Sequence, residues 1–375
     1  MTDQTEMLFR LLRMSLNIEQ DSKYSDLSVF ANIEAENWEQ LFDLSVKQGV
    51  LLLSYGGLQY LPSELQPPRK LKLRWCVNVV KGSERYDHYK NAIAKLSNLF
   101  LANKTSFLLI KGVTISELYP VPYFRESGDI DIYLLGKAEQ TEEMLYSLGI
   151  KAERKISKHS TFIWEGVPVE NHYTFFDTAL RFGRERQLYQ KMEVILKNMF
   201  SEDMFLPVNT GNVCQLPPQA AALFFIGHTF RHFCCLDVNI RQMCDWTVFF
   251  SKHRKNIDNE LLSSQIAELG LSEFVCHVNS FCSTYLGFSP YFIVPSAADI
   301  KAQSFVLKTI MRYRLKPKIH IPVFDVLRYL FRRNYIYRKY LGKVTASEFL
   351  LPEVRNYFVY LLRHRWRADS KKLSV

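Results

Sequence analysis

Two aspartates, Asp129 and Asp131, lie two residues apart at the start of segment 129–134, in which polar and apolar residues alternate. Alternation of this kind predicts a strand, and residues two apart on a strand point to the same face. Two carboxylates held side by side repel each other unless a cation lies between them, and their oxygens suit hard divalent ions such as Mg²⁺. The triplet alone is weak evidence, because a solvated strand edge also explains it.

Three further features could complete a site around the two aspartates. Glu170 lies in a second strand-like segment and can point to the same site if the two strands are neighbours. Lys111 and Gly112 follow an apolar run and precede a short helical segment, so the backbone there could approach a phosphate and offer helix amides to it. Arg125 could neutralise a triphosphate as a bidentate donor. Each feature also has a plain explanation, as a solvated charge, a turn residue or an exposed strand position.

The elements that must position these residues form a short α/β zone. Its strands are predicted from apolar runs and alternation, and its helices from periodicity and from a closing glycine. The predicted strands are 107–110, 129–134, 160–165 and 167–173, the last two joined as a hairpin at Gly166, and the predicted helices are 114–118 and 139–148.

Helical periodicity dominates the chain on both sides of this zone, with one long helix expected over 70–103 and only helices expected from about 179 onward. We therefore expect an α+β fold built on a small mixed-sheet core. The expected regions are an N-terminal helical region (1–100), the α/β core (101–178), a helical domain (179–300) and a basic, aromatic-rich helical C-terminal segment (301–375).

The order of the motifs is similar to that of a known family. Along the chain come Lys111-Gly112, a helix, a Tyr-Pro pair, Arg125, then Gly-Asp-Ile-Asp before an apolar strand, and later Val-Glu-x-His ending at His172. This order resembles the uncharacterised nucleotidyltransferase family of the DNA polymerase beta-like nucleotidyltransferase superfamily. A weaker resemblance extends to His228, His232, Arg241 and Asp245.

The resemblance implies a Mg²⁺-dependent transfer of an NMP from an NTP to a hydroxyl or phosphate acceptor that the sequence does not name. Asp129 and Asp131 would bind two Mg²⁺ ions about 3.5–4 Å apart. Glu170 would be the third carboxylate, sharing a metal or accepting the proton of the attacking hydroxyl. The phosphates would be held by Lys111, Gly112 and Arg125, and the cleft would be lined by His172, His232, Arg241 and Asp245. A role in bacterial surface-glycan biosynthesis is also implied by the family alone.

Two departures from the superfamily pattern weaken individual assignments. Lys111-Gly112 stands where the superfamily usually has Gly-Ser, so the usual serine contact to phosphate is missing or replaced. Asn171 follows Glu170 where an apolar residue is expected, which makes Glu170 the least secure of the three carboxylates.

Other functions remain open at this point. A glycosyltransferase also uses Asp-x-Asp, but there the motif generally ends an apolar strand, whereas here the apolar residues follow it. A catalytically silent member that binds a nucleotide or a partner is the second alternative. His228 and His232 are spaced i, i+4 and could bind a metal with nearby cysteines, but no Cys-x-x-Cys pair is present and a packed helical face is preferred.

The charge is unevenly distributed. The net charge of +10 arises because residues 301–375 contain 18 Lys/Arg against 4 Asp/Glu, while the rest of the chain is slightly acidic. The segment 322–368 mixes arginines with aromatics, a pattern of helices whose aromatics pack inward while the charges are solvated. Contact with an anionic membrane is the next interpretation, and nucleic-acid binding is the weakest of the three.

Composition limits the remaining classes. With 375 residues and 47% hydrophobic residues, the chain can bury a sizeable core. No apolar run reaches the roughly 18 residues of a membrane-spanning helix. Seven scattered cysteines favour reduced thiols over a disulfide framework. We therefore expect a cytoplasmic protein, with peripheral association at the inner membrane face as an open option.

Overall fold

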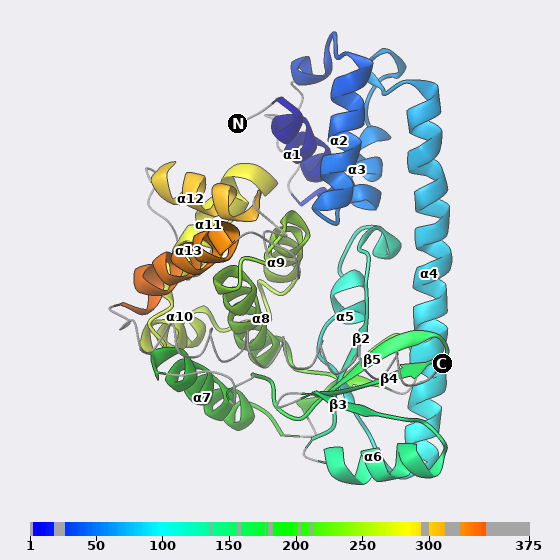
Figure 1. The fold of residues 1–375 in the computed structure, drawn as a ribbon, viewed down its shortest axis with the longest axis vertical. Coiled ribbons are helices and arrows are strands. Elements are labelled where there is room, and N and C mark those ends of the chain that lie inside the picture. The colour runs from blue at the N-terminus through cyan, green and yellow to red at the C-terminus, as the bar shows by residue number, and fades with distance from the viewer. Residues whose placement is uncertain are drawn as a thin grey trace.

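Helices account for most elements of the computed structural model (Figure 1). It describes residues 3–18, 27–135, 137–155, 159–176, 178, 183–201, 204–210, 213–293, 300–311 and 323–342. The N-terminal helices are α1 (Asp3–Leu16), α2 (Ala35–Lys47), α3 (Leu51–Leu58) and α4 (Arg69–Ala102). Short 3-10 helices lie at Ser28–Phe30 (η2), Ser63–Leu65 (η3) and Pro122–Phe124 (η4).

Helix α4 confirms the long helix expected after the two prolines. Pro68 precedes its first residue in an extended conformation, and the helix then runs for 34 residues along one side of the molecule (Figure 1). Gly82 lies in its middle, where a Cβ atom would come within 2.2 Å of Leu52 in α3. The glycine therefore lets α3 and α4 pack closely.

A seven-stranded mixed sheet forms the α/β part, with strand order β3-β4-β5-β2-β1-β7-β6. The parallel pairs are β2 with β5 and β1 with β7, and the other neighbours are antiparallel. The strands are β1 (Leu108–Leu109), β2 (Ile130–Tyr133), β3 (Glu153–Lys155), β4 (His159–Trp164), β5 (Val167–His172), β6 (Leu206–Pro207) and β7 (Cys214–Gln215). The four predicted strands and the hairpin at Gly166, which has φ +76°, are confirmed.

The expectation that only helices follow residue 179 is wrong at two places. Strands β6 and β7 lie in that region, and β7 pairs with β1, so the sheet extends past residue 178. Each of these strands has two residues, too few to show a period in the sequence. The division of the chain into four regions remains a prediction.

The two faces of the sheet differ in character because its strands alternate. Ile130, Ile132 and Val169 belong to a small apolar core with residues of α4 and with Leu145 of α6 (Ala138–Ser147). Asp131 and Tyr133 point to the opposite face, and Tyr133 belongs to the larger core formed with the C-terminal helices. Asp131 and Glu170, which pair with each other, thus lie on the face toward the C-terminal helices.

The C-terminal helices and the N-terminal helices share that larger core. Phe9 of α1 stacks on Tyr285 of α11 with ring centroids 4.8 Å apart. The remaining helices are α5 (Val113–Ser116), α7 (Gly183–Asn198), α8 (Pro218–Cys234), α9 (Ile240–Lys252), α10 (Asn259–Glu268), α11 (Ser272–Leu286), α12 (Ile300–Ile310) and α13 (Val323–Leu341). Mixed α/β architecture with flanking helices is therefore confirmed.

Helix α13 belongs to the basic C-terminal segment and contains several of its arginines and aromatics. Tyr337 and Tyr340 are buried, and Tyr340 packs against Phe230 and Phe274, whereas Phe331 and Tyr335 are exposed. The inward packing of two tyrosines agrees with the first of the three interpretations for this helix. Residues 343–375, with the second predicted basic helix at 352–368, lie outside the described residues. Among the helices that are described, none has the length and hydropathy needed to span a bilayer.

Candidate active site

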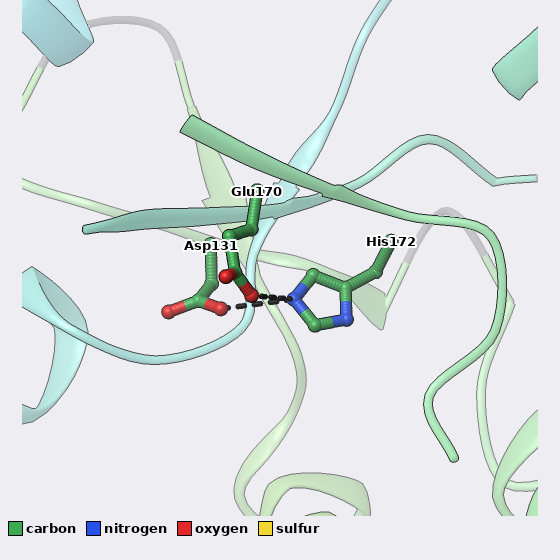
Figure 2. A group of neighbouring side chains, drawn as sticks. All are labelled: Asp131, Glu170 and His172. Atoms are coloured by element: carbon green, nitrogen blue, oxygen red, sulfur yellow. Dashed lines mark hydrogen bonds and ion pairs between the residues drawn. The ribbon is translucent and has the colours of Figure 1, made fainter. Parts of the chain in front are cut away.

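Strands β2 and β5 bring two of the predicted carboxylates together. The parallel register places Asp131 opposite Glu170 and Tyr133 opposite His172. Asp131, Glu170 and His172 each offer one ligand atom, and these atoms lie within 4.8 Å of one another. Figure 2 shows the carboxylates of Asp131 and Glu170 next to the ring of His172. His172 Nε2 is 2.9 Å from Asp131 Oδ1 and 3.6 Å from Glu170 Oε2. The two strands are neighbours, which was the condition for Glu170 to reach the site of Asp131.

Asp131 is as deeply buried as His172, each with 1% of its side chain exposed. Its Oδ1 atom is 2.9 Å from both Lys111 Nζ and His172 Nε2. Burial alone would raise the pKa of Asp131, but Lys111 and His172 outweigh burial and hold that pKa well below its usual range. The other oxygen, Oδ2, is buried and makes no hydrogen bond with any described residue. A buried, ionised oxygen in this state is a fitting metal ligand.

Asp129 lies beside this group but does not belong to the set within 4.8 Å. Burial, then the negative charges of Asp131 and Glu170, raise the pKa of Asp129 to about 6, against the opposing effect of Lys111 and Arg125. The mutual repulsion shows that the three carboxylates act on one another. The carboxylates of Asp129, Asp131 and Glu170, with Asp131 Oδ2 not hydrogen-bonded to any described residue, are oxygen ligands that suit a hard divalent cation. The catalytic and metal-binding roles of Asp129, Asp131 and Glu170 remain predictions.

Lys111 and Gly112 connect β1 to the short helix α5. Gly112 has φ +76°, a conformation that favours glycine, and its Cβ position would lie 3.6 Å from the carbonyl oxygen of Asp129. Lys111 Nζ lies between Asp131 and His228, at 2.9 Å from Oδ1 and 3.3 Å from Nε2. The lysine therefore adjoins the carboxylates, and its contact with phosphate remains a prediction.

Arg125 and Asp245 form a buried ion pair that the sequence does not reveal. Arg125 Nε and Nη2 donate to the two carboxylate oxygens at 3.0 and 2.9 Å, and Nη1 donates to the Ser127 hydroxyl at 2.8 Å. The Tyr119 hydroxyl also donates to Asp245, at 2.7 Å. This pair fastens the loop before β2 to α9. Both residues were predicted to contact the nucleotide or line the cleft, and that role is untested.

Two more predicted cleft residues, Arg241 and His232, lie on the helices: Arg241 contacts the same loop, and His232 contacts His228, the neighbour of Lys111. Arg241 of α9 donates to the carbonyl oxygen of Glu126 at 2.9 Å. His232 of α8 is 3.1 Å from His228 and 2.7 Å from the carboxylate of Asp237. Arg241 thus supports the segment that precedes Asp129, whereas His232 supports His228.

Sequence reasoning missed three partners of the site, which are His159, Tyr119 and Asp237. His159 stands opposite His172 in the β4–β5 hairpin, and its Nε2 is 3.6 Å from Glu170 Oε1. Pairing across a predicted hairpin could have indicated this contact. Asp237 has no local signal, and the Tyr-Pro pair that includes Tyr119 entered only the motif order, because the contact of Tyr119 with Asp245 depends on how the helices pack.

The alternative metal site at the α8 histidines finds no support. Within the described part of the chain, the Asp131, Glu170 and His172 group is the only His/Cys/Asp/Glu cluster of metal-binding dimensions. None of the seven cysteines is in a disulfide.

A small pocket, open to solvent, lies next to the loop that carries Arg125. Tyr86 and Tyr89 of α4 line it with Tyr123, and the Tyr89 hydroxyl donates to the carbonyl oxygen of Gly128 at 2.9 Å. Aromatic faces of this kind can stack against a planar ring.

Comparison with known proteins gives one match. A family model described as an uncharacterised nucleotidyltransferase matches residues 34–287, a range that contains every site residue named above. Neither the curated proteins nor the solved structures include a match to this chain.

Proposed function

Since the chain belongs to the uncharacterised nucleotidyltransferase family and is thus an enzyme of the nucleotidyltransferase class, we propose that it moves an NMP from an NTP to a hydroxyl or phosphate acceptor with the help of Mg²⁺. The dependence on metal is supported by the convergence of the Asp131 and Glu170 side chains. It is also supported by Asp131 Oδ2, which is buried and makes no hydrogen bond with any described residue. The Asp-x-Asp glycosyltransferase alternative is set aside, because the family match covers the motif.

Asp129, Asp131 and Glu170 would hold the metal, with two ions as the expected stoichiometry. A divalent cation held by these carboxylates would supply positive charge to the α-phosphate and neutralise charge that develops on it. Lys111 adds a positive charge at the same place, and Gly112 leaves room for a phosphate against the backbone.

Glu170 is the residue placed to accept the proton of the attacking hydroxyl. It is half-buried, with 23% of its side chain exposed, so an acceptor can reach it. His159 and His172 lie 3.6 Å from its two oxygens, one on each, so the carboxylate stands between two imidazole rings. In-line attack on the α-phosphate then releases pyrophosphate.

Glu170→Gln should lose about 10²- to 10⁴-fold in transfer rate, because it removes the proton acceptor. The measurement is transfer of label from α-labelled NTPs in the presence of Mg²⁺, with a metabolite and protein extract as the source of acceptors. Asp87→Asn, an exposed acid on α4, is the matched control and should keep the wild-type rate.

A Glu170→Gln variant as fast as wild type would remove Glu170 from the mechanism. Binding of NTP with no transfer under any condition would favour the catalytically silent alternative.

The chemical identity of the acceptor and the cellular location of the protein are further proposals. A glycan intermediate of bacterial surface-glycan biosynthesis is one candidate acceptor for the screen. Contact of segment 322–368 with an anionic membrane remains a prediction, as does a cytoplasmic location, and nucleic acid stays the weaker partner.

A further inference from the structure

The outer face of α4 changes character along its length. The helix runs along one side of the molecule, and its inner face is apolar and buried, as expected of a helix that covers a core (Figure 1). Further along the helix the outer face is polar, with Asn91 and Lys95 exposed. Nearer its start the outer face carries Leu73, Val77 and Val80, whose exposed fractions are 56%, 52% and 59%. Over residues 73–80 the outer face is therefore apolar, in contrast to the polar stretch that follows.

These three side chains form one stripe. They follow one another at intervals of four and three residues, which is the spacing of residues that share one face of a helix. A stripe with this spacing is what one helix presents to another in a helix pair. All three side chains stay more than half exposed, so no other element of the described structure covers them. Burial of the stripe against a partner would remove its apolar surface from water and would be favourable.

Opposite charges continue the stripe at its two ends. Lys70 lies seven positions before Val77 and Glu84 lies seven positions after it. Seven residues are close to two helical turns, with a drift of about 20°, so the three side chains share one face. Both charged residues are exposed, and neither forms an ion pair with a described residue. The outer face therefore reads positive, apolar and negative in that order.

This order makes the face complementary to a second copy of itself. In an antiparallel pair with its two-fold axis at Val77, Lys70 of each copy lies opposite Glu84 of the other, because both are seven positions from the axis. Leu73 of each copy then lies near Val80 of the other, and the two Val77 side chains meet at the axis. A parallel pair would instead place like charges opposite each other, which is unfavourable.

An anionic membrane fits the same face less well. Amphipathic helices that bind such membranes have mainly Lys and Arg beside their apolar face. An anionic bilayer would attract Lys70 but repel Glu84, and both continue the apolar stripe. Only an arrangement that offers a negative charge at one end and a positive charge at the other satisfies both residues.

We propose that the chain forms an antiparallel two-fold dimer through the outer face of α4, with Leu73, Val77 and Val80 at its centre and two Lys70–Glu84 pairs at its ends. These residues lie outside the carboxylate site, so the inference goes beyond the proposed function and is tested separately from it. A single helix pair buries less than the roughly 800 Å² per partner of a standard interface. The dimer should therefore be reversible, with a Kd of about 1–100 µM.

Sedimentation velocity of the full chain between about 1 and 200 µM measures this association. Wild type should shift from monomer to dimer as its concentration rises. Val77→Asp places two carboxylates together at the axis and should weaken the dimer about 100-fold or more. Val194→Asp is the matched control, because Val194 of α7 is 60% exposed and lies outside the stripe, and it should dimerise as wild type does. Thermal unfolding should show that both variants remain folded.

Exchange of the end charges tests the antiparallel arrangement itself. Lys70→Glu and Glu84→Lys each bring like charges opposite each other at both ends, so each variant alone should dimerise about 10-fold more weakly than wild type. In an equimolar mixture of the two variants, both ends again join opposite charges. The mixture should therefore form a heterodimer with about the affinity of wild type.

Three results of these experiments would overturn the proposal. They are a wild-type chain that stays monomeric up to 200 µM, a Val77→Asp variant that dimerises as wild type does, and a mixture of the charge variants that associates no better than either alone. Flotation with phosphatidylcholine–phosphatidylserine vesicles tests the competing occupant. Vesicle binding that is lost in Val77→Asp, by a wild-type chain that remains monomeric, would assign the face to a membrane instead.

Discussion

Asp129→Asn should lose nucleotidyl transfer and yet be more stable than wild type when metal is removed. The loss of transfer should reach roughly 10³-fold or more, because an amide cannot replace a carboxylate that neutralises metal charge. The gain in stability arises because Asp129 is charged in the folded protein at a cost: its pKa is raised to about 6, first by burial and then by Asp131 and Glu170.

This cost depends on pH in a defined direction. The carboxyl of Asp129 ionises near pH 3.8 in the unfolded chain and near pH 6 in the folded protein. Below pH 3.8 both states are protonated and no penalty exists. Between these values stability falls as pH rises, and above pH 6 the penalty is constant at no more than about 3 kcal/mol. Asp129→Asn removes the penalty, so its advantage should appear across that window.

Thermal unfolding from pH 4 to 8 in a chelator measures this difference. The midpoint of the variant should exceed that of wild type above pH 6 and converge with it near pH 4. Addition of Mg²⁺ should raise the midpoint of wild type more than that of the variant. The assignment of Asp129 to a common site with Asp131 and Glu170 fails if the variant is less stable than wild type at pH 8 in chelator.

Among single substitutions at the site that leave Asp129, Asp131 and Glu170 unchanged, Asp245→Ala should destabilise the protein most. The substitution leaves the Arg125 guanidinium without its charged partner, although only 8% of the Arg125 side chain is exposed. It also removes the carboxylate that accepts from the Tyr119 hydroxyl. Loss of one partner from a buried ion pair costs about 3–5 kcal/mol. The loop before β2 should also shift, so the transfer rate should fall together with stability.

Urea unfolding measures the stability loss, and an exposed pair provides the control. Glu39→Gln breaks the Arg74–Glu39 pair, whose side chains are 47% and 50% exposed, and should cost no more than about 1 kcal/mol. The double variant Arg125→Met/Asp245→Leu should recover much of the stability, because it leaves no buried charge. If Asp245→Ala costs no more than Glu39→Gln, the ion pair does not anchor the loop.

Local patterns in the sequence were sufficient for the part of the site that lies on two neighbouring strands. A period of two gives Asp131 on β2 and Glu170 on β5 a defined face of each strand, and the parallel pairing of the two strands then places both side chains together. The order of motifs also identified the family correctly. Both inferences depend on patterns within the segment 111–172.

Contacts set by the packing of distant helices could not be predicted in this way. Asp245 is 120 positions from Arg125, and nothing in the intervening residues indicates that they meet. His228 and His232 were recognised as one helical face, but their contact with Lys111 depends on how α8 lies against the sheet. The aromatics of α13 likewise divide into buried and exposed sets that follow from contact with α8.

The packing of α1 against α11 has a consequence while the chain is being synthesised. Arg13 of α1 donates to the carbonyl oxygen of Thr284 in α11, 271 positions later, at 3.2 Å. At about 5–20 residues per second, the ribosome needs roughly 15 to 50 seconds to cover that separation. For that time the apolar face of α1 that later meets α11 has no native cover, and Phe9 is available to chaperones or to other nascent chains. The sheet is also incomplete during this time, because β1 remains an unpaired edge strand until β7 has been synthesised.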